Sequence, residues 1–135
     1  MMRKFVEVPT RIHNAIMILC VLAGNRTRHP VSLSFINQYL KLSYGYLEQV
    51  ASPLKKAGLI NAYRGSGGGY KLAKKASEIS VLEVISALEG DIKIASCLGA
   101  GKCRIEKRCP SKKIYVRLQD ELNRGLENIK ISDFK

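Results

Sequence analysis

Four glycines fall among residues 65–69 of this 135-residue chain, and this run limits the fold more than any other feature. Because glycine favours tight turns, the run predicts a turn between a strand at residues 59–64 and a return strand at residues 70–73. Glycine-rich loops also hold nucleotide phosphates, but those loops end in Gly-Lys-Ser or Gly-Lys-Thr and join a strand to a helix. The run here joins two strands, which favours a β-hairpin over a nucleotide site.

Three helices are predicted before the hairpin, because apolar residues recur there every three or four positions. The first covers residues 10–24 with Thr10 as its N-cap, the second covers residues 32–40, and the third lies between Ser43 and Gly58. Two short helices joined by a brief turn are typical of a helix-turn-helix, and the hairpin that follows would be its wing.

Two further helices are predicted in the second half of the chain. Ser80 and Glu83 form a capping box that opens the fourth helix, and Gly90 closes it. The last helix begins at Pro110. Its apolar stripe consists of Ile114, Leu118, Leu122, Leu126 and Ile129. Since a lone helix beyond a compact domain cannot bury such a stripe, pairing with a second copy in a homodimer is favoured over packing onto its own domain.

The predicted fold class is therefore mainly α with a small β-hairpin wing. We expect a winged helix-turn-helix DNA-binding domain at residues 1–90, a cysteine-rich loop at residues 91–109, and a dimerisation helix with its tail at residues 110–135.

The charge of the chain points to a polyanionic partner. The net charge is +12, and residues 1–75 hold 12 Lys and Arg against only Glu7 and Glu48. Such an imbalance attracts nucleic acid. The sequence holds no apolar run of about 18 residues and no signal peptide at its N-terminus, so we expect a cytoplasmic protein with no membrane partner.

Three evenly spaced cysteines predict a metal site. Cys97, Cys103 and Cys109 are each separated by five residues, in a segment too rich in glycine and charge to be a core element. A loop that folds back would bring three thiolates together, as zinc and iron–sulfur clusters require. Because cytoplasmic thiols stay reduced, metal or redox chemistry is favoured over a disulfide framework. Such a site on a DNA-binding scaffold would make a sensor.

Nearly the whole chain beyond residue 30 resembles the Rrf2 family of bacterial regulators. The resemblance rests on Tyr-Leu-Glu-Gln at residues 46–49, on residues 54–60, on Arg-Gly-Ser-Gly-Gly-Gly-Tyr-Lys-Leu at residues 64–72, and on the cysteine triplet. That family includes regulators of iron–sulfur assembly, of the nitric oxide response and of cysteine metabolism. The resemblance implies a winged-helix homodimer on double-stranded DNA with a palindromic operator. Its third helix would enter the major groove, and its wing would lie along the minor groove.

The resemblance also assigns DNA contacts. Glu48 and Gln49 fall where the family reads bases, and Arg64 falls where the wing contacts the groove. A glutamate accepts from a cytosine amine, and a glutamine bonds an adenine edge in two places. Gly45 stands where the iron–sulfur assembly regulator has a serine. The full predicted set is Ser43, Gly45, Tyr46, Glu48, Gln49, Lys55, Lys56, Arg64 and Lys71, with Lys74 and Lys75 as further phosphate contacts.

The resemblance implies that Cys97, Cys103 and Cys109 hold an iron–sulfur cluster, and we prefer a two-iron (2Fe-2S) cluster to a four-iron (4Fe-4S) one. Part of the family supplies a fourth ligand from a histidine at the position of Lys112, which is charged at pH 7 and a poor ligand. Other members use a side chain from the first helix of the other copy. His13 of the partner subunit is therefore the predicted fourth ligand, with Glu7 or an exchangeable small molecule as alternatives.

Two other readings stay open at this point. A regulator of the same family without a cluster could respond to thiol oxidation or to a protein partner. The same cysteines with a histidine could hold a structural zinc ion. An enzyme is not expected, because the sequence shows no Ser/His/Asp set, no paired-carboxylate cleft and no nucleotide loop.

Overall fold

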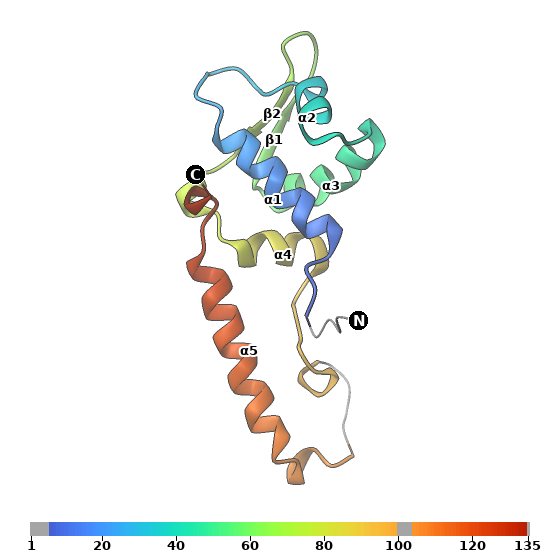
Figure 1. Cartoon of the computed structure of the whole chain (residues 1–135), viewed down its shortest axis with the longest axis vertical. Coiled ribbons are helices and arrows are strands. Elements are labelled where there is room, and N and C mark those ends of the chain that lie inside the picture. The colour runs from blue at the N-terminus through green and yellow to red at the C-terminus, as the bar shows by residue number, and fades with distance from the viewer. Residues whose placement is uncertain (1–5, 100–103, 135) are drawn as a thin grey trace, which may run out of the picture.

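The computed structural model describes residues 6–99 and 104–134, and it shows a mainly helical chain with one antiparallel hairpin (Figure 1). The fold class predicted from the sequence is confirmed. The helices and strands are α1 (Thr10–Ala23), α2 (Leu33–Leu40), α3 (Tyr44–Lys56), β1 (Ile60–Tyr63), β2 (Gly69–Leu72), α4 (Val81–Glu89) and α5 (Ser111–Asn128). Four 3₁₀ turns join them: η1 (Ala76–Glu78), η2 (Ser96–Leu98), η3 (Glu106–Arg108) and η4 (Ile131–Asp133).

One hydrophobic core holds α1 to α4 and the hairpin together. Each helix turns its apolar stripe inward, and α1 packs against α2, α3 and α4. Burial of these side chains is the main favourable contribution to folding. The largest fully buried members are Ile12, Ile18, Leu19, Ile36, Leu47, Leu54, Leu59, Ile60, Ile79 and Ile131, together with Val50 and Val84.

The helix starts follow the predicted caps with two corrections. Ser43 caps α3 by accepting from the Tyr46 N–H at 3.2 Å, as expected. Thr10 is not the N-cap of α1, because Pro9 has the extended backbone that this position needs and Thr10 is already helical. The last helix begins at Ser111 rather than Pro110, since Pro110 occupies the N-cap position.

The glycine run forms the turn of the predicted hairpin. β1 and β2 pair in the register Ile60↔Leu72 to Tyr63↔Gly69. Gly69 has φ 148°, and a Cβ there would collide with the backbone oxygen of Val31. Close approach at this point lets the backbone of Tyr70 exchange two hydrogen bonds of 2.9 Å with Val31. The return strand of the wing, close to the turn, is therefore bonded to the segment that leads into α2.

α5 extends away from the core, and the chain after it returns to the core (Figure 1). The Val81 N–H donates to the Ile129 carbonyl and the Ile131 N–H donates to the Ile79 carbonyl, both at 2.9 Å. Ile131 is 1% exposed and belongs to the main core. The three-part domain division stays a prediction, and these contacts place the end of the third part in the core of the first.

A candidate DNA interface and a cysteine loop

The outer face of α3 carries the predicted base-reading residues. Gly45, Glu48 and Gln49 are exposed, because the opposite face of the helix buries Leu47 and Leu54 in the core. An α-helix with a polar outer face has the width that fits the major groove of DNA. The sequence and the fold therefore put these three residues on one accessible surface.

A hollow on this face joins α3 to its neighbours. It is lined by Glu48, Gln49, Lys55 and Tyr70, and also by Arg11 from α1. Burial raises the pKa of the Tyr70 hydroxyl, and the negative charge of Glu48 raises it further. An ordinary tyrosine already keeps its proton at neutral pH, and the raised pKa extends this to higher pH. Its hydroxyl is then a possible hydrogen-bond donor in the hollow that Glu48 also lines.

Arg11 is a candidate that the sequence reasoning missed. Its guanidinium lies 3.7 Å from the Glu89 carboxylate at the end of α4. The Arg11 side chain is 46% exposed, so this ion pair leaves part of the guanidinium accessible at the edge of the hollow. A charge at the start of α1 is brought to α3 only by the packing of the two helices, which no local pattern reveals.

Two predicted contacts also have structural roles. The Ser43 hydroxyl caps α3, and the Tyr46 hydroxyl accepts from the Asn14 side-chain amide at 3.0 Å. Tyr46 thus joins α3 to α1. Direct contact of either residue with DNA stays a prediction.

The wing carries Arg64 at an exposed position just after β1. Lys71, on the return strand, donates from Nζ to the Arg28 carbonyl at 2.9 Å and lies 6.0 Å from the centre of the Tyr63 ring. These contacts connect the wing to the loop before α2. An ammonium has three donors, so Lys71 keeps capacity for a phosphate.

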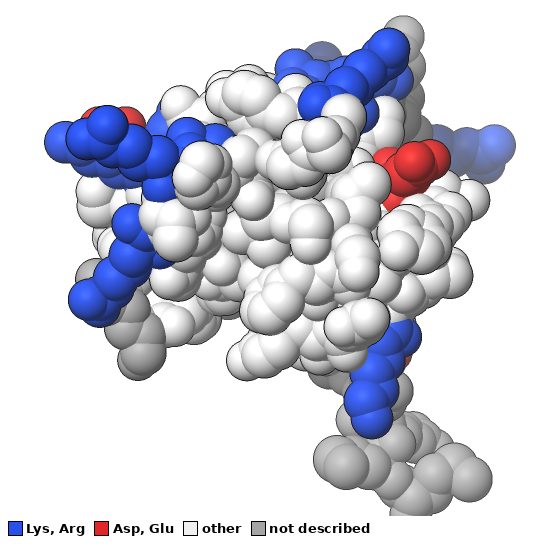
Figure 2. All heavy atoms as spheres, turned by 90° about the horizontal axis from the view of Figure 1, so that it is seen from above, with Lys and Arg blue, Asp and Glu red and all other residues white. Residues whose placement is uncertain are grey.

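Cationic side chains surround this end of the molecule. Seen from the end that carries α2 and the wing, Lys and Arg side chains lie around the rim of the face (Figure 2). Lys55, Lys56 and Lys75 are exposed. Lys74 is engaged instead, because its Nζ lies 2.7 Å from the Glu83 carboxylate.

The cysteine loop is anchored to α5. The Ile94 N–H donates to the Gln119 side-chain oxygen at 2.9 Å, and η2, which contains Cys97, packs against α5. Gln119 is 5% exposed. A glutamine in a helix stripe gives no sequence signal for such a role, so the analysis of the sequence missed it. This bond places the first cysteine beside the helix that the third cysteine precedes.

Cys97 and Cys109 are free, half-buried thiols at the two ends of the loop. Cys103, the second predicted ligand, lies outside the described residues. Among the residues that are described, no three His, Cys, Asp or Glu side chains come close enough to hold a metal ion. Arg104, Lys107 and Arg108 are exposed in the same loop. Free thiols among cations suit an anionic iron–sulfur cluster, and the thiols also suit zinc.

The other predicted ligand position lies on α1. His13 is exposed there, on the first turns of the helix. Cys20, two turns further on, packs against the hydrophobic core, and burial raises the pKa of its thiol. Cys20 is therefore a packing residue.

α5 leaves an apolar surface uncovered. Ile114 is 60% exposed and Leu118 is 52% exposed, although both belong to the predicted stripe. Ile129, the last residue of that stripe, lies just beyond the helix in extended conformation and is 42% exposed. Packing of α5 onto its own domain therefore leaves three of the five stripe residues exposed and buries Leu122 and Leu126 only in part.

Comparison with known proteins decides the family. The Rrf2 family model, described as an iron-dependent transcriptional regulator, matches residues 8–135. The chain belongs to the Rrf2 family. This Rrf2 protein is 38% identical to the HTH-type transcriptional regulator IscR of Escherichia coli over 119 residues, which cover 88% of this chain and 74% of that protein.

Solved Rrf2 structures show the same fold. CymR, the global cysteine regulator of B. subtilis, superposes with a TM-score of 0.76 at 31% identity, covering 95% of both chains. IscR of T. potens superposes with a TM-score of 0.74 at 30% identity, covering 95% of this chain and 85% of that one. This Rrf2 chain is accordingly a transcription regulator with a DNA-binding winged helix. No helix in the described part of it is long and apolar enough to span a bilayer.

Proposed function

We propose that two copies of this chain bind a palindromic DNA operator, and that a cluster held by Cys97, Cys103 and Cys109 controls this binding. The observation that carries the DNA part is the exposure of Glu48 and Gln49 on the outer face of α3, in a winged helix of a regulator family. One α3 would enter the major groove of each half-site, and Arg64 on the wing would reach the adjacent groove.

The uncovered stripe of α5 supports the homodimer. Exposed large apolar residues in one row mark an interaction surface. A two-fold dimer would pack this row against its own copy, since such an interface joins the same surface of both subunits. The two recognition helices would then be held at a fixed spacing.

The cysteine loop supports the sensing part. Two-iron ligation is preferred to four-iron, and His13 of the partner subunit is the proposed fourth ligand. When bound, the cluster would supply a redox-sensitive and nitric-oxide-sensitive centre held by thiolates. The positive charge of Arg104, Lys107 and Arg108 would favour the anionic state of the site.

A path of hydrogen bonds supports control of DNA binding by the loop. The loop is bonded to α5 through Gln119, and the end of α5 is bonded to the start of α4 through Ile129 and Val81. α4 packs against α3. A change at the cysteines would therefore reach the recognition helix through packed elements.

Thiol control without a cluster is the second candidate. A structure described as the oxidized form of Staphylococcus aureus CymR superposes on this chain with a TM-score of 0.71 at 31% identity, covering 93% of both chains. In this chain, oxidation of Cys97 or Cys109, both free thiols, would be the controlling event. A structural zinc site with the same cysteines is the third.

Metal and sulfide analysis of protein purified without oxygen tests the cofactor. We expect a coloured protein with iron and sulfide in equal amounts, about two of each per chain, and loss of both in Cys109→Ser. Cys20→Ser, which removes a thiol outside the loop, should keep the colour. A colourless protein with bound zinc, or with no metal after reconstitution, would contradict the cluster.

A further inference from the structure

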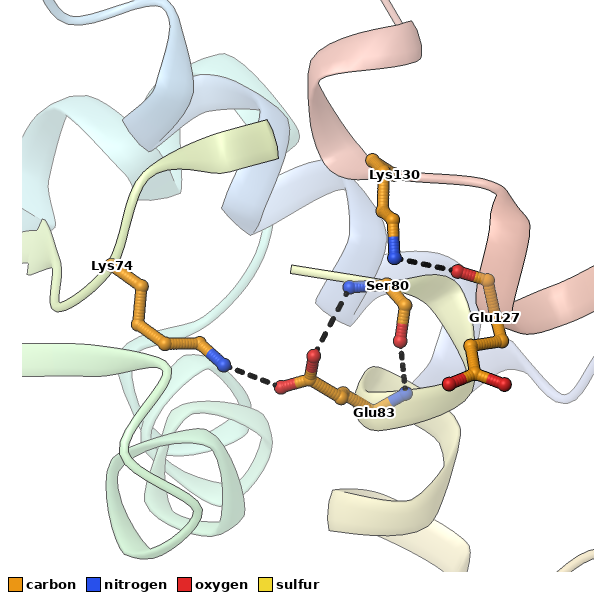
Figure 3. A network of polar contacts seen from close by, with 5 residues as sticks. All are labelled: Lys74, Ser80, Glu83, Glu127 and Lys130. Atoms are coloured by element: carbon orange, nitrogen blue, oxygen red, sulfur yellow. Dashed lines mark hydrogen bonds and ion pairs between the residues drawn. The ribbon is translucent and has the colours of Figure 1, made fainter. Parts of the chain in front are cut away.

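The wing is bonded to the start of α4 by an ion pair (Figure 3). Lys74 is the second residue after β2, and its Nζ lies 2.7 Å from Oε2 of Glu83. The side chains of the two residues are only 35% and 40% exposed. The Ala73 N–H donates to the Leu59 carbonyl at 2.9 Å and closes the hairpin just before this point. Lys74 is therefore the first side chain beyond the base of the wing that can fix its direction.

Hydrogen bonds that do not involve Lys74 hold the Glu83 side chain in place. Its N–H donates to the Ser80 hydroxyl at 3.1 Å, and its Oε1 accepts from the Ser80 N–H at 3.5 Å. This capping box uses one carboxylate oxygen for the helix and leaves the other for the lysine. The carboxylate is thus a preorganised partner, which reduces the entropy lost when the pair forms.

The start of α4 is in turn fixed to the chain after α5. Ser80 is 3% exposed and is paired through its backbone with Lys130, whose Nζ donates to the Glu127 carbonyl at 2.7 Å. Figure 3 shows Lys74, from the segment after β2, and Lys130, from the chain after α5, around the capping box at the start of α4. Lys74 connects the wing to this junction.

We propose that Lys74 and Glu83 are positioning residues that hold the wing, and with it Arg64, in place for DNA, and that Lys74 is not a phosphate contact. The proposal rests on the DNA-binding function proposed above. A Lys74 that turned to a phosphate would leave the Glu83 carboxylate without its cation beside a polyanion. The ion pair with Glu83 and a phosphate contact therefore compete for the same Lys74 ammonium.

The charges of two variants separate these roles. Lys74→Gln and Glu83→Gln both remove the pair, and the glutamine at residue 83 still accepts from the Ser80 N–H through its amide oxygen. If Lys74 bound a phosphate, Glu83→Gln would strengthen DNA binding, because it removes a negative charge near the polyanion. If the pair positions the wing, both variants weaken binding.

The experiment titrates each variant against a duplex selected by the wild-type protein from a pool of random sequences, at several salt concentrations. We expect each single variant and the double variant to bind the duplex about fivefold more weakly, the order of one well-formed partly exposed pair. The slope of log affinity against log salt should stay at the wild-type value. In an Arg64→Ala background the same variants should change affinity less than about twofold, since Arg64 is what the pair positions.

Three further variants serve as references. Lys75→Gln, at the neighbouring exposed lysine, should reduce the salt slope by about 0.9, as expected when one phosphate contact is lost. Arg124→Gln removes one positive charge from an exposed pair with Glu121 on α5 and should change neither affinity nor slope. Lys74→Arg keeps the pair and should restore wild-type binding. Circular dichroism of every variant shows whether it is folded. If Lys74→Gln does not fold, the comparison of Lys74→Arg with Glu83→Gln still decides the test.

Three results would overturn the proposal: tighter binding by Glu83→Gln, a salt slope reduced by about 0.9 in Lys74→Gln, or unchanged affinity in both variants. If the wild-type protein selects no duplex, the DNA-binding function itself fails and this inference fails with it. If the wild-type protein binds a duplex and any of the three results is found, only the positioning role of Lys74 and Glu83 is rejected, and the DNA-binding function stands.

Discussion

At the scale of single residues, the recognition surface depends on side chains that the fold leaves exposed beside a tightly packed core. Glu48 and Gln49 are exposed on α3, whereas the residues on either side of them, Leu47 and Val50, are buried in the core. This pattern follows from helix geometry, because successive residues lie about 100° apart around the helix axis. The proposed base-reading residues can therefore be changed without disturbing the core.

Gln49→Ala should relax the sequence preference of the protein. We expect operator affinity to fall about fivefold or more, since one good base contact contributes about 1–3 kcal/mol of discrimination. Binding to a scrambled duplex should stay the same, because phosphate contacts carry that affinity. Fluorescence anisotropy with both duplexes measures the two values. Asn128→Ala, an exposed amide at the end of α5, is the control, and an equal loss on both duplexes would argue against base reading.

Cys20 should react slowly with alkylating reagents. The thiolate is the reactive form, and burial raises the pKa of this thiol in the folded state. At neutral pH, iodoacetamide should therefore modify Cys20 more slowly in the folded protein than in the urea-unfolded chain. The difference between the two rates should shrink as the pH rises through the raised pKa. Peptide mass spectrometry after timed iodoacetamide treatment follows this residue. Equal rates in the folded and unfolded chain would show that Cys20 is not packed as described.

At the scale of elements, the wing is held at three places: by the Val31 bridge, by the Lys71 contact with Arg28 and by the Lys74–Glu83 pair. A short hairpin is marginally stable alone, so these attachments decide its orientation. The first two join the wing to the segment before α2, and the third joins it to the start of α4.

Gly69→Ala should destabilise the protein. The new Cβ would collide with the Val31 backbone, and the φ of 148° is strained for alanine. We expect the free energy of unfolding to fall by about 2 kcal/mol or more. Gly24→Ala is the matched control, because its φ of −74° suits alanine and its Cβ would make only ordinary contacts. Urea unfolding measures both variants, and equal stability of the two would contradict the close approach of the wing to Val31.

The sequence predicts those elements whose causes are local. Ser43, the Ser80–Glu83 box and the glycine turn each act over a few residues, and all three are where the pattern places them. The return of Ile131 to the core and the Lys74–Glu83 pair depend on the packing of distant segments, so no periodicity in the sequence predicts them. Within the candidate site, the exposure of Glu48 and Gln49 followed from the helix period, whereas the roles of Arg11 and Gln119 did not.

At the scale of the whole molecule, the charged end with α3 and the wing is uncovered in the single copy, and so is the apolar row of α5. The two surfaces lie on one connected body, because residues 129–131 bond the end of α5 to α4. Dimerisation through α5 would therefore set the distance between two recognition helices.

Leu118→Asp should prevent dimerisation. Leu118 is 52% exposed in the single copy, so aspartate costs the monomer little and burying its charge in a dimer costs much. Sedimentation equilibrium should give twice the chain mass of 15.0 kDa for the wild-type protein and the chain mass for the variant. Val116→Asp is the control, because Val116 is 41% exposed on the opposite side of the helix. A wild-type monomer, or a dimeric Leu118→Asp, would place the interface elsewhere.

Footprinting of the wild-type protein on its selected duplex tests the central claim most directly. The account predicts two protected half-sites related by two-fold symmetry, with centres about one helical turn of roughly 34 Å, or a multiple of it, apart. Protection should be lost in Leu118→Asp at protein concentrations that saturate the wild-type complex. Protection of a single asymmetric site, or of no site at all, would contradict a dimeric winged-helix regulator that reads a palindrome.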